Sequence, residues 1–98
     1  MENKNNNSDI TYVPISNIWV ARKRENLTQT QLAFLLDHKS TSSLDRWEKG
    51  VLPDSQNMMK LAVALSVPVE YLFQDYIALY KSEIVPRKYE LGQEDMQM

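Results

Sequence analysis

The stretch of sequence that decides the fold runs from residue 28 to residue 50 and reads TQTQLAFLLDHKSTSSLDRWEKG. Its first residue, Thr28, is followed three positions later by Gln31, which is the Thr-x-x-Gln form of a helix N-terminal capping box. Apolar residues then recur at helical spacing, which predicts an amphipathic helix. They are Leu32, Ala33, Leu35 and Leu36.

A second short helix is expected after the polar turn formed by residues 37–40. Ser40 or Thr41 can cap its start, and Gly50 suits the left-handed position after its end. Leu44 and Trp47 lie on one face of this helix, whereas small polar residues and an arginine lie on the other. A helix that packs by one edge and offers hydrogen-bonding side chains on the opposite edge is suited to reading DNA bases.

The flanking sequence predicts further helices and no strand. Ser16 can cap a helix that runs to about Glu25, and Asn26 suits its left-handed end. Asp54 can cap another helix, on which Met58, Leu61, Ala62 and Leu65 repeat at helical spacing. From Pro68 the apolar spacing continues through about Ile84, so a fifth helix is expected there, with Pro86 closing it. The core is expected to hold Trp47, Leu32, Leu36, Leu44, Leu61 and Leu65.

The block from Ser16 to Phe73 resembles the helix-turn-helix domain of the Cro/repressor-type (XRE) family. The resemblance rests on Arg22, the Leu27-Thr28-Gln29-x-x-Leu32-Ala33 start, the Leu44-x-x-Trp47-Glu48-x-Gly50 end, Pro53, Leu61-Ala62-x-Ala64-Leu65, and Val67 with Leu72-Phe73. It implies an all-α fold, namely a five-helix lambda-repressor-like DNA-binding domain with a C-terminal helical extension. The expected organisation is a disordered arm at 1–14, the domain at 15–73, the helical extension at 74–85 and a flexible tail at 86–98.

The sequence departs from the family pattern at three places. The glycine usual in the turn is absent, and Asp37 stands near its place. The turn is also one residue longer, which shifts the expected base contacts by about one residue. Finally, Asn26 and Ser66 stand where members of the family often have glycine.

The resemblance and the helix faces together give a set of expected DNA contacts. Arg46 is the expected base reader, because arginine pairs with guanine O6 and N7. Gln29 is expected to bond a phosphate and to brace the recognition helix, as in similar domains. Asp45 is expected to pair with a neighbouring cation rather than to accept from a cytosine amine. The full expected set is Gln29, Lys39, Ser40, Thr41, Ser42, Ser43, Arg46 and Lys49, in which the lysines would contact phosphates.

Two further groups have expected structural roles. Arg22 and Glu48 stand where similar domains form an internal ion pair, so they are interpreted as structural. Beyond the domain, an apolar stripe follows at 3–4 spacing and must be covered by its own chain or by a partner. The hypothesis is a two-fold dimer interface, and the alternative is that this helix folds back on the first helix near Trp19. The stripe consists of Tyr76, Ile77, Tyr80 and Ile84.

Composition limits the other possibilities. The chain has 98 residues, no cysteine and a net charge of −2, and no apolar run approaches the roughly 18 residues of a membrane span. The lone His38, expected to be solvent-exposed in its polar turn, has no ligating neighbours in the sequence, so no metal and no cofactor are expected. No nucleophile with a base and an orienting partner is visible, so no enzymatic activity is expected. Without a signal peptide, the expected location is the cytoplasm.

These observations predict a sequence-specific double-stranded-DNA-binding transcriptional regulator, with repression as the expected mode and a homodimer as the expected state. The sequence offers no separate effector domain, so control is expected to come from dimerisation, a partner or competition for sites. Two alternatives remain open. The tail from about Gln74 could bind a protein partner, as in an antitoxin, or the domain could serve as an adaptor that does not bind DNA.

Overall fold

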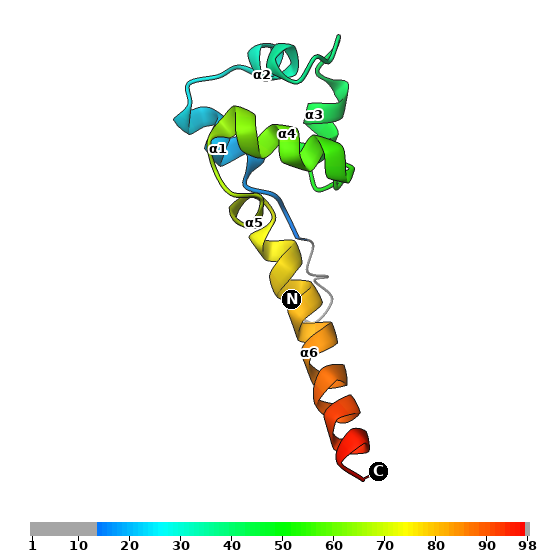
Figure 1. Cartoon of the computed structure of the whole chain (residues 1–98). Helices are drawn as coiled ribbons and strands as arrows, with labels where there is room; N and C mark the ends of the chain where they lie inside the picture. Colours follow the sequence, from blue (N-terminus) through cyan, green and yellow to red (C-terminus); the bar gives the residue numbers. More distant parts are fainter. Residues whose placement is uncertain (1–13, 98) are drawn as a thin grey trace, which may run out of the picture.

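The structure is a computed structural model that describes the backbone of residues 14–97 and the side chains of residues 14–93. Over that range the chain is helical, without a strand, so the predicted all-α class is confirmed (Figure 1). Nearly all of the predicted N-terminal arm lies outside the described residues. The helices are α1 (Ile18–Arg24), α2 (Gln29–Leu35), α3 (Ser42–Glu48), α4 (Ser55–Leu65), α5 (Val69–Leu72) and α6 (Gln74–Gln97).

Two of the predicted helix caps are confirmed. Thr28 Oγ1 accepts from the backbone N–H of Gln31 at 3.1 Å, and the Gln31 side chain accepts from the backbone N–H of Thr28 at 2.8 Å. Asp54 Oδ1 accepts from the backbone N–H of Asn57 at 2.9 Å. Both caps satisfy amides that the first turn of a helix leaves without an intrahelical partner. They fix the starts of α2 and α4 from local sequence alone.

The predicted cap of the first helix is confirmed only in part. Asn17 occupies the N-cap position of α1 and makes no side-chain cap hydrogen bond. Ser16 is buried, and its hydroxyl donates to the backbone carbonyl of Trp47 at 3.3 Å. The same Ser16 hydroxyl accepts from the backbone N–H of Ile18, the first residue of α1, at 3.3 Å. A tertiary partner is therefore added to the local role that its residue type suggested. At α3, Thr41 is the N-cap residue and makes no side-chain cap hydrogen bond, whereas Ser40 Oγ accepts from the backbone N–H of Ser42 at 3.5 Å.

The chain turns between helices through left-handed backbone positions. Asn26 (φ 58°) ends α1 and Gly50 (φ 118°) follows α3, as predicted. Asp37 (φ 62°) and Ser66 (φ 58°) also adopt this region, although neither is glycine. The left-handed region costs an L-residue about 1–2 kcal/mol, and asparagine and aspartate tolerate it best. The missing turn glycine is therefore replaced by Asp37 in the same backbone conformation.

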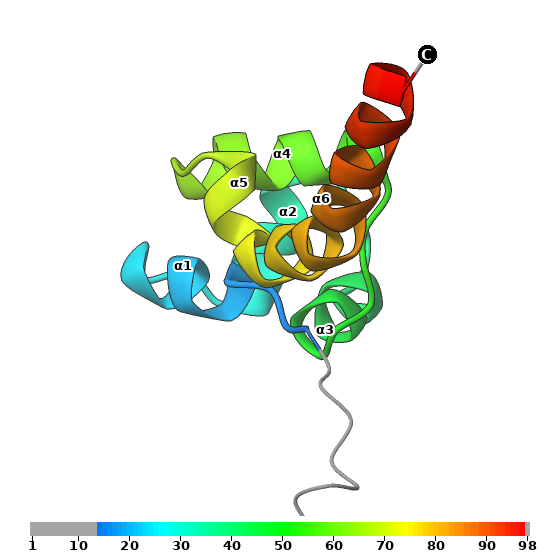
Figure 2. The ribbon, with the colours of Figure 1, turned by 90° about the horizontal axis from the view of Figure 1, so that it is seen from below.

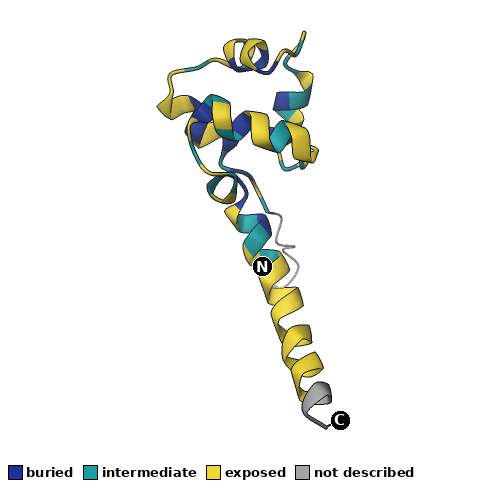
Figure 3. Ribbon diagram, viewed as in Figure 1, coloured by how far each residue is buried: buried dark blue, intermediate teal, exposed yellow. Residues whose placement is uncertain are grey.

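One apolar core joins the first five helices to the start of α6. All six predicted core residues are buried, and α1 and α5 add Ile18, Ala21 and Leu72. α1 packs on α3 and α4, α2 packs on α3, and α5 joins α4 to α6. Figure 3 shows burial concentrated in this part of the molecule, with α6 exposed along most of its length.

The C-terminal part of the chain differs from the prediction in two ways. The continuous helix expected from residue 69 is broken, because α5 ends at Leu72 and Phe73 leaves helical geometry (φ −122°) as its ring enters the core. The predicted end at Pro86 is also wrong, since α6 contains Pro86 and continues to Gln97. A proline removes one helical hydrogen bond, whereas good helix formers such as Arg87, Lys88 and Leu91 follow it.

α6 makes the molecule elongated. Its first turns begin against the domain, and the rest points away from it (Figures 1 and 2). The radius of gyration is 18.1 Å, compared with about 13 Å for a compact domain of 100 residues. The compact block therefore carries a long helix whose distal turns have few neighbours within the chain.

Candidate nucleic-acid interface

The outward face of α3 carries the polar side chains that the sequence predicted to meet DNA. Leu44 and Trp47 face the core, whereas Ser42, Arg46 and Lys49 are exposed. Because a helix advances about 100° per residue, these three side chains share one side of α3. Lys39 and Ser40, just before the helix, are also exposed. The structure thus brings most of the predicted contact set to one surface.

The start of α3 is an internally bonded serine cluster. The hydroxyls of Ser40 and Ser42 lie 2.9 Å apart. Ser43 is half-buried, and its Oγ accepts from Arg46 Nη2 at 3.4 Å. Thr41 is half-buried as well. Ser40, Ser42 and Arg46 are therefore the members of this group that solvent reaches most freely.

The inner side of α3 is held by a charged network. Arg22 Nε donates to Glu48 Oε2 at 2.7 Å, Nη2 donates to Glu48 Oε1 at 3.1 Å, and Nη1 donates to the carbonyl of Leu27 at 2.9 Å. Both charged side chains are below 10% exposed. Gln29 Nε2 also donates to Glu48 Oε1, at 3.0 Å. The predicted ion pair is present, and Gln29 braces the end of α3 as expected.

Two residues outside the helix-turn-helix stretch donate to carbonyls at the C-terminal end of α3 and just after it. Ser16 donates to the carbonyl of Trp47, and the Tyr76 hydroxyl donates to the carbonyl of Gly50. Carbonyls in the last turn of a helix and just after it lack the regular helical acceptor role, so other donors satisfy them. Sequence reasoning missed both roles, because neither residue has a local signal that points to α3.

The turn between α2 and α3 is anchored through His38. Its Nε2 lies 3.2 Å from Asn57 Oδ1 on α4, and its ring meets the edge of the Trp47 ring at a centroid distance of 5.6 Å. His38 is half-buried, so the expectation of a solvent-exposed histidine is wrong. A turn that is one residue longer than usual is thereby tied to two elements of the core.

A surface ion pair lies on the outer side of α3. Lys49 Nζ is 2.8 Å from Asp45 Oδ2, one helical turn away. The hydrogen bond from Lys49 lowers the pKa of the Asp45 carboxyl, and the Asp45 carboxylate raises the pKa of the Lys49 ammonium. Asp45 pairs with a neighbouring cation, as expected. The Lys49 ammonium at this surface is therefore already paired with a carboxylate.

Comparison with known families agrees with this geometry. A family model described as Helix-turn-helix matches residues 20–72, which is more than half of the chain. The chain belongs to the Cro/repressor-type (XRE) helix-turn-helix family. As a member of that family it is a DNA-binding transcription regulator. No match to a curated protein was found. None of the helices described here is long and apolar enough to cross a membrane.

The predicted dimer stripe of this helix-turn-helix protein is divided between two environments. Tyr76 is 7% exposed and belongs to the chain's own core, so its ring is covered by this chain and not by a second subunit. Ile77 is half-buried, whereas Tyr80 and Ile84 are exposed. Leu91, seven residues after Ile84, extends the exposed part of the stripe. Leu91 was not predicted as part of the stripe, because the helix was expected to end at Pro86.

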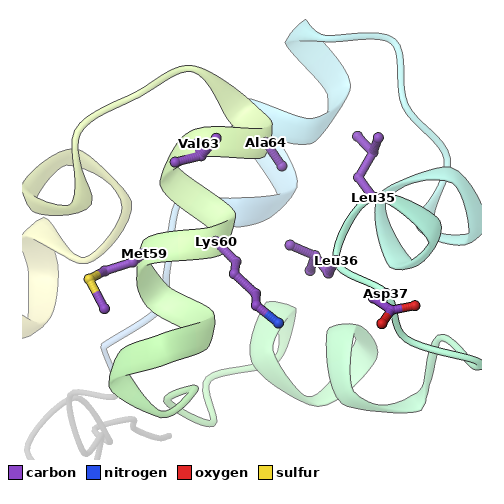
Figure 4. Close-up of a pocket in the computed structure, with 7 residues that line it drawn as sticks. All are labelled: Leu35, Leu36, Asp37, Met59, Lys60, Val63 and Ala64. Carbon is purple, nitrogen blue, oxygen red and sulfur yellow. The ribbon is translucent and has the colours of Figure 1, made fainter.

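A second apolar surface of the helix-turn-helix domain lies between α2 and α4. It is a groove of about 590 Å³. Figure 4 shows Leu35 and Ala64 on its two walls with Leu36 below them, and Lys60 and Asp37 at one end. Met59 and Val63 on α4 add exposed apolar side chains. This groove is separate from the outward face of α3.

Proposed function

We propose that the chain is a sequence-specific reader of double-stranded DNA that acts as a transcriptional repressor. α3 enters the major groove and Arg46 pairs with a guanine, while exposed serines at the start of α3 contact neighbouring bases or phosphates. Lys39 and Gln29 contact the phosphate backbone, which positions the domain without specifying sequence. Occupying the DNA at a promoter is sufficient to exclude other proteins from it.

The observation that carries this proposal is the combination of an exposed, polar outer face on α3 with a rigid inner side. Arg22 and Gln29 donate to Glu48 on the inner side of the helix, and His38 ties the turn that leads into it to Asn57 on α4. Base readout requires side chains held in a fixed register, because hydrogen bonds to base edges are directional. The scaffold around α3 supplies that register.

The experiment is a selection from random duplexes, followed by affinity measurements for two variants. Arg46→Ala should weaken binding to the selected duplex by about 1–3 kcal/mol and relax one base position. Lys39→Ala is the matched control, since it removes an equally exposed cation from the same surface. It should weaken selected and random duplexes alike and flatten the salt slope by about one unit.

One result would contradict the proposal, and another would contradict the role it gives to Arg46. A selection at moderate salt that enriches no sequence is incompatible with specific reading. If Arg46→Ala enriches the same sequence as the wild type, Arg46 contacts no base, although the protein still reads DNA sequence. A reporter gene placed behind the selected sequence tests repression. If the protein is a repressor, expression of the reporter should be lower when the protein is present.

We infer further that the protein works as a homodimer joined through α6. Helix-turn-helix proteins commonly read two half-sites with two-fold symmetry. Tyr80, Ile84 and Leu91 are 43%, 50% and 59% exposed. They are separated by four and then seven residues, which places them on one side of α6. Most helical stability in proteins comes from the packing of an apolar face, so packing against a second α6 would stabilise the distal turns.

A protein partner is the second candidate for this surface. The exposed length of α6 and the groove between α2 and α4 both favour contact with another protein, as in an antitoxin-like or adaptor role. The two candidates differ in what the purified chain does alone. A chain that remains monomeric by sedimentation at micromolar concentration favours the partner, whereas a concentration-dependent dimer favours self-association.

A further inference from the structure

The acidic residues of α3 occupy two different environments. The Glu48 side chain is 7% exposed and accepts hydrogen bonds from Arg22 and Gln29. The Asp45 side chain is 47% exposed and forms an ion pair with Lys49. Asp45 is therefore the carboxylate that α3 brings to its solvent-facing side.

Asp45 lies beside the surface assigned to DNA. It lines one surface depression together with Gln29 and Lys49. Helical periodicity also places it next to Arg46 and Lys49 on the outer side of α3. A negative charge at this place repels phosphates, so Asp45 is unfavourable in a DNA-reading helix unless its charge is compensated.

The ion pair with Lys49 compensates the charge of Asp45. An ammonium held 2.8 Å from a carboxylate contributes no net charge to the surface. Sequence-independent affinity comes from the release of counterions by cations that contact phosphates. While the pair is intact, Lys49 therefore adds little to binding at random DNA.

The carboxylate also has a defined partner among the bases. In the major groove, aspartate accepts a hydrogen bond from the N4 amino group of cytosine. A cytosine at the right position would satisfy Asp45, and the Lys49 ammonium would then be free to bind a phosphate. At any other base, releasing Lys49 would leave the carboxylate without a donor, so the pair would stay intact.

We propose that Asp45 is a selectivity residue that withholds Lys49 from the phosphates of non-cognate DNA and releases it where a cytosine amino group takes over the carboxylate. This inference rests on the proposed insertion of α3 in the major groove. It makes one base contact and one phosphate contact depend on each other, which raises the ratio of specific to non-specific binding.

The test is a double-variant cycle in the full chain. Wild type, Asp45→Ala, Lys49→Gln and the double variant are titrated with the selected duplex and with a random-sequence duplex of the same length. Salt is varied between about 50 and 200 mM, the range over which phosphate contacts change affinity strongly. Circular dichroism melts check that each variant is folded, which is expected because both side chains are on the surface.

On random DNA, Asp45→Ala should steepen the salt slope by about one unit because Lys49 becomes available. Lys49→Gln should leave that slope unchanged, and the double variant should return to the wild-type slope. On the selected duplex, Lys49→Gln should flatten the slope by about one unit. Asp45→Ala should reduce the preference for cytosine at one position by at least about fivefold.

A second variant keeps the shape of the side chain. Asp45→Asn removes the charge without changing the size of the group, and asparagine pairs with adenine N6 and N7. The preferred base at that position should therefore change from cytosine to adenine. A selection repeated with this variant measures the change directly.

Several outcomes would overturn the inference. If the double variant keeps the steeper slope on random DNA, Asp45 acts only by repelling phosphates. If Asp45→Ala and Asp45→Asn leave the base preference unchanged, Asp45 reads no base. Failure of the wild type to select any sequence would instead contradict the proposed function itself, and that result appears before any variant is made.

Discussion

At the scale of single residues, Arg22 does more than pair with Glu48. Its three donor nitrogens serve both carboxylate oxygens and the carbonyl of Leu27. A guanidinium fork matches a carboxylate in a way that a lysine ammonium cannot. Arg22 therefore joins α1, the loop before α2 and the end of α3 at one buried point.

Removing this guanidinium should unfold the domain before it changes specificity. Arg22→Ala leaves Glu48 buried with Gln29 as its remaining side-chain donor, and such a change typically costs about 3–5 kcal/mol. The free energy of unfolding, measured by urea titration with circular dichroism, should fall by that amount. Lys49→Ala, which breaks a solvent-exposed pair, is the control and should leave the free energy of unfolding nearly unchanged. A loss below 1 kcal/mol in Arg22→Ala would show that the pair is not structural.

At the scale of elements, the turn between α2 and α3 depends on the backbone of Asp37. Its φ of 62° lies in the left-handed region, which β-branched residues adopt only with strain. The turn also contacts the core through His38, so a change in its path would move α3. The turn therefore connects backbone conformation with the orientation of the recognition helix.

Two substitutions at this position should differ in the size of their effect on stability. Asp37→Val should lower the free energy of unfolding by about 1–2 kcal/mol, because the side chain clashes in left-handed geometry. Asp37→Gly relieves the strain but adds freedom to the unfolded chain, so its net effect should stay below about 1 kcal/mol. Thermal melts of both variants provide the measurement. Equal destabilisation by valine and glycine would indicate that the Asp37 side chain, not its backbone, matters.

The accuracy of the sequence predictions followed the range of the interactions. The caps at Thr28 and Asp54 and the apolar faces of α2, α3 and α4 depend on neighbours within one or two turns, and they were predicted correctly. Ser16, His38 and Tyr76 depend on partners 31, 19 and 26 residues away, and no local pattern specifies those. The Arg22–Glu48 pair is also long-range, and it was predicted only because the family resemblance supplied it.

The two errors near the C-terminus have different physical causes. Apolar spacing continues across Phe73, so periodicity could not reveal that the backbone leaves helical geometry there to bury the ring. At Pro86 the general tendency of proline to end a helix does not hold, because a helix can lose one hydrogen bond and continue when strong helix formers follow. The DNA contacts remain predictions, since they depend on a partner molecule.

At the scale of the whole molecule, the compact domain and the projecting α6 separate two tasks. The domain buries its own core and presents α3, whereas the distal turns of α6 present apolar side chains to solvent (Figure 3). Two domains joined through such a helix would hold two recognition helices at a fixed separation. The oligomeric state would then determine which half-site spacings the protein binds.

The stripe on α6 predicts how the dimer responds to a single charge. Ile84→Glu places a carboxylate in the middle of the stripe, so burying it between two helices would leave two like charges without partners. Sedimentation at micromolar concentration should show a dimer for the wild type and a monomer for this variant. Ser82→Glu is the matched control, because Ser82 is exposed on the opposite side of α6, and it should leave the dimer intact. Loss of the dimer in both variants would indicate a general effect of charge, and a wild-type monomer would exclude self-association and leave a different protein as the partner of α6.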